Sequence, residues 1–568
     1  LHRLSILFYD RRVPFRTNAL LSVTCKIYGD SGPHVKTPSG EIEGFFMETR
    51  GGRKIAAYTS IPFAEPPVGE LRFKAPVPKK SWSHILDARR ESPKCVQRNP
   101  YTREKHIVGT EDCLHLNVYS PVISNAIKLP VMVWFHGGGW MCGDGSTSNY
   151  GPEFLLDKNV IYVATNYRLG PLGFLSTQDK ACPGNNGLKD QQEALRWVQR
   201  NIDAFGGDKH SVTIFGESAG GASVHFHMIS PTSAGLFHKA ISQSGTALVP
   251  WAEAPDGEAK EKARLLAKVL DCPSQPSESF IQCLRTKDSY DIIGTEYKFY
   301  KWDYDQMTPF KAVVEPDLPG AFLTKSPRLN PNLPSVPWMT GLTKDEGCLK
   351  SVFITAHKSR FLEFSKWFDN IAPITFYYDN SADVNFITNS IRETYLKGRL
   401  GPLTQDDAKA GILNIYTDSY FAYPAIEAIK IAFNYTKSPI YLYELTYRAT
   451  NSFSQIFGDP KGNYGVCHAD DLMHLFPIHF LNKPFSLKDL EISETMLTLW
   501  TNFAISGNPN TPGKISTTWK PLKNIKKMEY LDIGQKLKMT HNLAHRSTFW
   551  EKMPLWHHNA TQRLVDEL

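Results

Sequence analysis

The pentapeptide Gly216-Glu217-Ser218-Ala219-Gly220 constrains the fold of this chain more than any other segment. It follows Ser211-Val212-Thr213-Ile214-Phe215, mostly β-branched or aromatic, and leads into small residues at 219–224 that let a helix pack close to that strand. Gly-x-Ser-x-Gly in this context predicts a turn so tight that the serine hydroxyl is exposed at strained backbone angles, above a helix N-terminus. The motif taken alone also fits an ordinary glycine-rich turn.

Other apolar runs alternate with segments of helical periodicity, which is the pattern of a sheet covered by helices on both faces. The predicted strands lie at 131–135, 160–164, 212–215, 239–242, 337–341 and 440–443. Helices are predicted over 188–204 and 257–270, where apolar residues recur at the spacing of one helix face. The alternation indicates an α/β fold with a mainly parallel sheet.

The 568 residues contain no internal repeat, low-complexity tract or long linker rich in proline, glycine and serine. We therefore expect one globular domain over 31–555, between tails at 1–30 and 556–568, the first a candidate remnant of a targeting segment. The net charge of +7 is spread along the chain, which argues against nucleic-acid binding. No run of about 18 apolar residues exists, so no membrane span is predicted.

A second glycine-rich segment, His136-Gly137-Gly138-Gly139, follows the apolar strand at 131–135. Glycines at a strand end let backbone N–H groups turn inward, because no Cβ atom stands in the way. Fixed donors of this kind stabilise the oxyanion of a tetrahedral acyl-transfer intermediate, by about 3 kcal/mol each. The segment is a candidate oxyanion hole, the alternative being a glycine-rich bend at the sheet edge.

A serine nucleophile needs a histidine to take its proton and a carboxylate to orient that histidine. Among 18 histidines, His468 stands out in the turn Gly465-Val466-Cys467-His468-Ala469-Asp470-Asp471. Glu346 lies in Thr343-Lys344-Asp345-Glu346-Gly347, directly after a predicted strand, with Asp345 as the competing acid. The order Ser218, Glu346, His468 is the nucleophile, acid and base order of α/β hydrolases.

These motifs, with four further segments, resemble the type-B carboxylesterase/cholinesterase family from about residue 35 to 549, with most likeness to insect carboxylesterases. The segments are Ala64-Glu65-Pro66-Pro67-Val68-Gly69-Glu70-Leu71-Arg72-Phe73, Glu111-Asp112-Cys113-Leu114-His115-Leu116-Asn117-Val118, Asn166-Tyr167-Arg168-Leu169-Gly170-Pro171-Leu172-Gly173-Phe174 and Phe215-Gly216-Glu217-Ser218-Ala219-Gly220-Gly221. The resemblance implies an α/β-hydrolase fold, a mostly parallel central sheet flanked by helices, with large helical insertions around an active-site gorge.

The resemblance also implies roles for individual residues. Ser218 would be the nucleophile, His468 the general acid and base, and Glu346 the orienting acid. The oxyanion hole would be the backbone N–H groups of Gly138, Gly139 and Ala219. An ion pair of Arg72 with Glu111 would brace the first disulfide loop, and Trp251 would form a wall of the acyl pocket, although it also fits a packing role. No cofactor, no metal and a monomeric state are expected.

The cysteines indicate an oxidising compartment. Cys95 with Cys113 and Cys272 with Cys283 are predicted disulfides, because each pair closes a short loop in a polar segment, and the resemblance supports both. Cys348 and Cys467 should lie near the triad, where we expect buried thiols that pack as small hydrophobic groups, with a disulfide between them as the minor alternative. The sequence assigns no partner to Cys25, Cys142 or Cys182.

Other short motifs agree with a secretory route, leading to secretion or to the lumen of the endoplasmic reticulum. Asn434-Tyr435-Thr436 and Asn559-Ala560-Thr561 are glycosylation sequons. The final residues Val565-Asp566-Glu567-Leu568 resemble a retention signal whose first position is changed.

The expected substrates are uncharged carboxylic esters of lipid, odorant or xenobiotic type. Cholinesterases bind a quaternary ammonium with a tryptophan in the first disulfide loop, whereas the loop from Cys95 to Cys113 has Tyr101 and no tryptophan. Juvenile hormone esterases usually carry glutamine in place of Glu217, which argues mildly against that alternative. A non-catalytic adhesion protein of the same fold is the alternative from another class, disfavoured because Ser218, Glu346 and His468 are all present.

Overall fold

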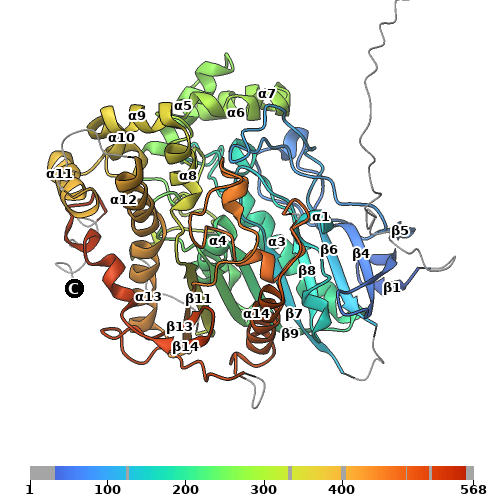
Figure 1. The fold of residues 1–568 in the computed structure, drawn as a ribbon. Coiled ribbons are helices and arrows are strands. Elements are labelled where there is room, and N and C mark those ends of the chain that lie inside the picture. Colours follow the sequence, from blue (N-terminus) through green and yellow to red (C-terminus); the bar gives the residue numbers. More distant parts are fainter. Residues whose placement is uncertain are drawn as a thin grey trace, which may run out of the picture.

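The computed structural model describes residues 32–122, 127–329, 335–397, 405–481, 483–510 and 515–557. The predicted tail at 1–30 with Cys25, the sequon at Asn559 and the final four residues lie outside the described residues. The described part forms one large sheet with helices on both faces and further helices above one end (Figure 1). None of its helices combines the length and apolar character that a membrane crossing requires.

The large sheet has eleven strands in the order β14-β13-β12-β11-β10-β9-β7-β8-β6-β4-β3. Pairings from β8 through β7, β9, β10, β11 and β12 to β13 are parallel, and those at both edges are antiparallel. The strands are β3 (Phe45–Glu48), β4 (Lys54–Pro62), β6 (His115–Pro121), β7 (Leu129–Phe135), β8 (Ile161–Thr165), β9 (Gly207–Glu217), β10 (Lys239–Gln243), β11 (Trp338–Thr343), β12 (Ile440–Leu445), β13 (Tyr530–Ile533) and β14 (Leu537–Thr540). A separate small sheet contains β1 (His34–Thr37), β2 (Gly40–Glu43) and β5 (Ile85–Asp87).

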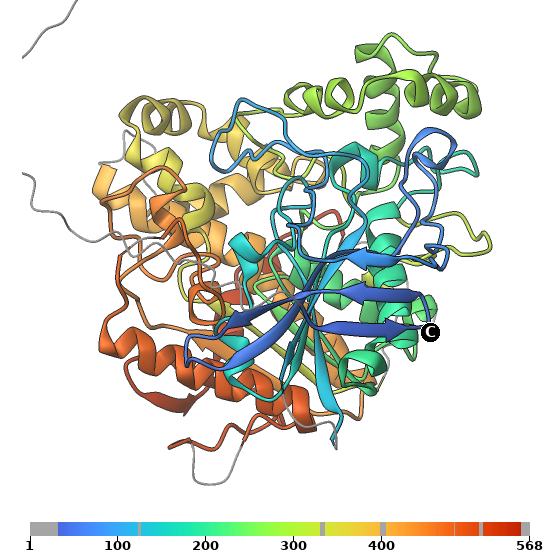
Figure 2. The ribbon, with the colours of Figure 1, turned by 90° about the vertical axis from the view of Figure 1, so that its right-hand side faces the viewer.

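Helices cover both faces of this sheet. Helix α14 packs against β7 and β9, while α4 packs against β9 and β10 with α3 behind it, and Figure 2 shows α3 and α14 on opposite sides of the strands. The helices are α1 (Thr147–Tyr150), α2 (Gly170–Phe174), α3 (Asn186–Asn201), α4 (Ala219–Ile229), α5 (Glu258–Val269), α6 (Ser277–Thr286), α7 (Ser289–Gly294), α8 (Cys348–Ala356), α9 (Lys358–Lys366), α10 (Phe368–Thr375), α11 (Val384–Tyr395), α12 (Gln405–Thr417), α13 (Tyr423–Tyr435) and α14 (Leu487–Ser506).

The register of the central strands places the sequence motifs at one edge of the sheet. Gly216 pairs with Phe135 on β7 and with Ser242 on β10, and Gln243 pairs with Gly341 on β11. The carboxyl ends of four neighbouring parallel strands therefore meet where the candidate motifs begin, which is where α/β folds bind ligands. The predicted parallel sheet and the two predicted helices, now α3 and α5, are confirmed.

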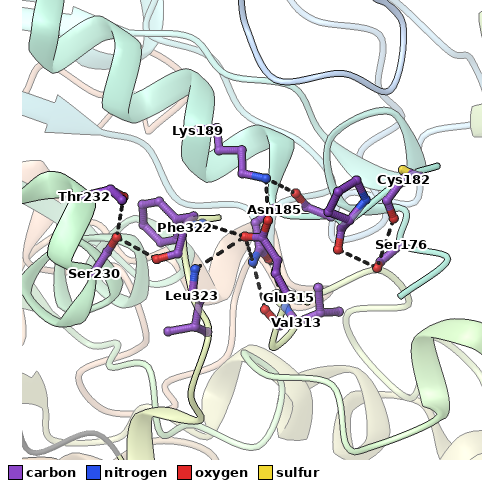
Figure 3. A network of polar contacts seen from close by, with 12 residues as sticks. Ser176, Cys182, Asn185, Lys189, Ser230, Thr232, Val313, Glu315, Phe322 and Leu323 are labelled. Carbon is purple, nitrogen blue, oxygen red and sulfur yellow. Dashed lines mark hydrogen bonds and ion pairs between the residues drawn. The ribbon is translucent and has the colours of Figure 1, made fainter. Parts of the chain in front are cut away.

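A buried polar network fixes the start of α3 against the segment 313–323 (Figure 3). Lys189 Nζ lies 2.5 Å from Glu315 Oε2 and donates to the Gly184 carbonyl at 3.0 Å. Glu315 Oε1 also accepts from Asn185 Nδ2 at 2.8 Å and from the Phe322 backbone N–H at 2.9 Å. Because the pair is buried and each charge is hydrogen-bonded, loss of one partner would cost about 3–5 kcal/mol. The network is structural and holds the segment 313–323 against the start of α3.

Candidate active site

Ser218 sits in a strained turn between β9 and α4. Its φ of 58° and ψ of −121° lie outside the usual regions, and its backbone N–H donates to the Gln243 carbonyl at 2.9 Å. A Cβ atom on Gly220 would lie 1.9 Å from the Phe135 carbonyl oxygen, so only glycine permits this approach of helix to strand. The serine is thus held in a strained conformation at the N-terminus of α4, as the motif predicts, but it is buried, with 5% of its surface exposed, whereas the motif predicted an exposed hydroxyl.

A buried histidine and carboxylate contact each other beside this turn. His468 Nδ1 lies 2.6 Å from Glu346 Oε2, and Glu346 Oε1 accepts the Thr343 backbone N–H at 2.7 Å. Asp345 instead accepts the Val466 backbone N–H at 2.8 Å. Of the two adjacent acids, Glu346 therefore contacts the histidine, and Asp345 supports the loop that carries it.

Glu217 faces the other nitrogen of the same imidazole. Its Oε1 lies 3.1 Å from His468 Nε2, and within the described residues no hydrogen bond joins His468 to the Ser218 hydroxyl. Hydrogen bonds of a catalytic site are often incomplete without substrate and tighten only when substrate binds. The sequence did not lead us to predict that Glu217 contacts the histidine, although its position directly before the serine indicated that it lies near the site.

These carboxylates control the charge of His468. Burial opposes protonation of the imidazole, but the charges of Glu217 and Glu346 outweigh it and raise the pKa of His468 to about 9. Burial in turn raises the pKa of Glu217, so that carboxyl holds its proton more tightly than an exposed one. His468 and Glu217 therefore titrate as a coupled pair.

The glycine loop after β7 runs against the serine. Gly138 and Gly139 have φ of 101° and 62°, where a side chain is strained, and a Cβ atom on Gly138 would lie 2.1 Å from the Cys142 carbonyl oxygen. A Cβ atom on Gly137 would lie 3.2 Å from Ser218 Cβ. With Ala219 directly after the serine, the three residues predicted to form the oxyanion hole lie on the two segments that flank its side chain.

The profile of the Carboxylesterase family matches residues 31–550. The chain belongs to this family. Venom carboxylesterase-6 of Apis mellifera is 37% identical over 539 residues, which are 92% of this chain and 94% of the relative. Juvenile hormone esterase of Tribolium castaneum is 36% identical over 524 residues (89% and 88%), and carboxylesterase 1F of Mus musculus is 34% identical over 567 residues (94% and 98%). The chain is an ester hydrolase, and the adhesion alternative is not favoured.

Aromatic side chains connect the histidine of the esterase to Trp251. The ring centroids of Phe421 and His468 are 4.6 Å apart, those of Trp251 and Phe421 are 6.0 Å apart, and those of Trp140 and Trp251 are 6.1 Å apart. Trp251 is fully buried, so its role as an acyl-pocket wall stays a prediction. Phe421 was missed, because the sequence analysis predicted no helix around it; it lies in a π-helical turn, Asp418–Ala422.

A pocket adjoins the glycine loop, and its empty space, including the part that is open to solvent, is about 500 Å³. Tyr101 and Met141 line it, and both would be contacted by a Cβ atom on Gly139. Its two cationic side chains are paired, Arg103 with Asp303 at 3.0 Å and Lys350 with Asp305 at 2.9 Å. The remaining lining is apolar or aromatic: Pro100, Trp302, Tyr304, Met307, Leu349, Phe353, Ile354 and Phe457. Each cationic side chain in the cavity wall of the esterase is therefore neutralised by a carboxylate.

The loop that carries Tyr101 is braced at several points. Arg72 Nε lies 2.7 Å from Glu111 Oε1, as expected, and Arg72 Nη1 donates to the Lys287 carbonyl at 2.7 Å. Arg98 lies 2.6 Å from Glu296. The predicted disulfide between Cys95 and Cys113 closes the loop, with Cα atoms 5.0 Å apart.

The remaining cysteines follow the sequence prediction in part. The Cys272–Cys283 disulfide is present, with Cα atoms 5.8 Å apart. The expectation that Cys348 and Cys467 are free thiols is wrong: they form a disulfide, because a parallel bridge of Asp345 with Cys467 brings their Cα atoms to 5.4 Å. Cys142 and Cys182 are buried thiols, and burial raises the pKa of Cys182 to about 12.

The pH dependence of activity is expected to change in Glu217→Gln. A general base must be neutral, so kcat/KM should rise with pH through the pKa of His468. Removing the Glu217 charge removes one cause that raises this pKa, so the midpoint of the rise should move to lower pH, by about one pH unit or more. Profiles of kcat/KM from acidic to alkaline pH check this. A midpoint that stays in place or moves upward would contradict the coupling.

Proposed function

We propose that this esterase hydrolyses uncharged carboxylic esters through an acyl-enzyme on Ser218. The buried contact of His468 Nδ1 with Glu346 Oε2 at 2.6 Å, beside the serine turn, is the observation that carries the proposal. In it, His468 Nε2 accepts the Ser218 proton while the serine oxygen attacks the ester carbonyl carbon. Glu346 holds Nδ1 protonated, which leaves Nε2 free as the base and stabilises the imidazolium that forms.

The oxyanion of the tetrahedral intermediate accepts hydrogen bonds from the backbone N–H groups of Gly138, Gly139 and Ala219. The imidazolium then protonates the leaving alcohol, and the acyl group stays on Ser218. Water, deprotonated by His468, attacks the acyl carbon and releases the acid, which regenerates the serine hydroxyl. Every proton is carried by the imidazole, so the cycle uses only this chain's own groups.

The cavity supports the preference for uncharged substrates. An ester that carries a charge would lose hydration there without gaining an unpaired counter-charge, since Arg103 and Lys350 are already neutralised. Glu217 faces Nε2 of the histidine at 3.1 Å, but burial raises its pKa, which weakens it as a partner for a cationic substrate. A broad esterase follows, rather than one selective for choline esters.

We also propose the secretory pathway as its location. Three disulfides are typical of proteins in oxidising compartments. Asn434 is exposed near the end of α13, where an attached glycan would meet solvent.

A panel of matched esters tests the substrate class. Butyrylthiocholine and its uncharged isostere, 3,3-dimethylbutyl thiobutyrate, differ in one charge at nearly equal shape. We expect the neutral thioester to have a kcat/KM higher by about tenfold or more, since one uncompensated charge in a confined cavity costs more than about 1.4 kcal/mol. Juvenile hormone belongs in the same panel, given the relative in Tribolium castaneum. Equal or better turnover of the choline ester would reject the proposed substrate class.

A further inference from the structure

The Cys348–Cys467 disulfide joins the two loops that carry the acid and the base. Cys348 is the first residue of α8, two positions after Glu346, and Cys467 directly precedes His468. Both cysteine side chains are fully buried. The covalent link is thus one residue away from the base and two residues away from the acid. Neither of the other two disulfides is as close in sequence to these two residues.

The two loops are otherwise independent parts of the chain. The disulfide spans a sequence separation of 119 residues, and helices α8 to α13 and strand β12 lie between its ends. By contrast, the Cys272–Cys283 bridge spans only 11 residues and closes a local turn before and within α6. Because the two loops are so far apart in sequence, only tertiary contacts can fix their relative position.

Non-covalent contacts between the two loops are few and polar. Asp345 donates its backbone N–H to the Val466 carbonyl at 2.9 Å, and its carboxylate accepts the Val466 N–H at 2.8 Å. On the far side of the base, Ala469 has a φ of 70°, and the Asp470 carboxylate accepts the Cys467 N–H at 2.8 Å. The His468–Glu346 contact, and the bonds that the Asp471 carboxylate accepts from Gln243 and Tyr443, also help to place the histidine loop. Among these contacts, the disulfide is the covalent one that joins the two loops directly.

We propose that the Cys348–Cys467 disulfide is a positioning element of the catalytic machinery, which holds His468 against Glu346 so that its Nε2 is oriented to accept the Ser218 proton. The inference rests on the proposed roles of Ser218, His468 and Glu346. A displacement of about 1 Å in such a site lowers the rate by about 100-fold, so a link that removes relative sliding of the two loops acts directly on kcat.

Two double variants and one control test this role. Cys348→Ser with Cys467→Ser removes the link and leaves polar groups, and Cys348→Ala with Cys467→Val removes the link and keeps the site filled with apolar volume. Cys272→Ser with Cys283→Ser is the matched control, since it removes a disulfide far from the triad in sequence. Active sites are counted by stoichiometric fluorophosphonate labelling, so that kcat is given per competent site and loss of folded protein is separated from loss of rate.

We expect both triad-side variants to lose about tenfold or more in kcat per labelled site, with little change in KM. Their kcat/KM should also rise at lower pH than in the unmodified protein, because a looser contact with Glu346 raises the pKa of His468 less. The control should keep its kcat per site and its pH profile. A merely structural bridge would reduce the number of labelled sites and leave these two properties unchanged.

Peptide mapping of the unreduced, alkylated protein is the companion measurement. It should yield one linked peptide pair containing Cys348 and Cys467, and alkylation of these two residues without reduction would overturn the inference. Wild-type kcat per site in the Ala/Val variant would overturn it as well. If the unmodified protein neither reacts with the probe nor hydrolyses esters, the proposed function itself fails, which is a distinguishable outcome.

Discussion

Ser218→Ala is expected to lower kcat for ester hydrolysis by about 10⁶-fold and to abolish labelling by a fluorophosphonate probe. Without the hydroxyl no acyl-enzyme forms, and the glycine loop retains only its ability to polarise the carbonyl group. Alanine adopts the φ of 58° at the same cost as serine, so the fold should be kept. Steady-state rates with a chromogenic ester and mass spectrometry of the labelled protein check both results.

Ser244→Ala is the control for this variant. Ser244 also has a positive φ, 51°, follows the neighbouring strand β10 and is fully buried, with a hydroxyl that has no hydrogen-bond partner in the described structure. Its replacement should leave rate and labelling essentially unchanged. Labelling that persists in Ser218→Ala would refute the assignment of the nucleophile.

Glu346→Gln is expected to lower kcat by about 10⁴-fold with little effect on KM. The glutamine can still accept the Thr343 N–H, so the turn after β11 should be kept. It lacks the charge that stabilises the imidazolium and can present its NH₂ group to Nδ1, which favours the wrong tautomer of His468. Kinetics at saturating and at low ester concentration separate kcat from KM.

Asp345→Asn distinguishes between the two adjacent acids. Its side-chain oxygen can still accept the Val466 N–H, and Asp345 does not contact His468, so the rate should change by only a small factor. If Asp345→Asn lost as much activity as Glu346→Gln, the acid of the site would have been assigned to the wrong residue.

The sequence predicted the central sheet and the segments of the site well, because these depend on local patterns. Each predicted strand overlaps an observed one, from β7 to β12, since fully buried parallel strands are continuous apolar runs. The edge strands β3 and β14 were not predicted, because they are short and partly exposed. The longer and mostly buried antiparallel strands β4 and β6 were missed as well. The conformations of the serine turn and the glycine loop depend on glycines within these segments, so the local sequence was enough to predict them.

What the sequence could not predict depends on segments that meet only in the folded chain. Glu217 faces His468 across 251 positions of sequence, and no periodicity encodes that contact. Phe421 lies in a π-helical turn where no helix was predicted, and it meets the histidine only in the folded chain. The pairing of Cys348 with Cys467 follows from the bridge at Asp345, and spacing alone favoured two separate thiols.

The braced loop around Tyr101 has a consequence for which esters the enzyme accepts. A segment closed by a disulfide and held by Arg72, Arg98 and Arg103 has little freedom to swing open as a lid. Esters that bind in this pocket then meet walls of nearly fixed outline, to which Tyr101 and Met141 contribute their side chains. We expect a pocket with such walls to discriminate between esters by size.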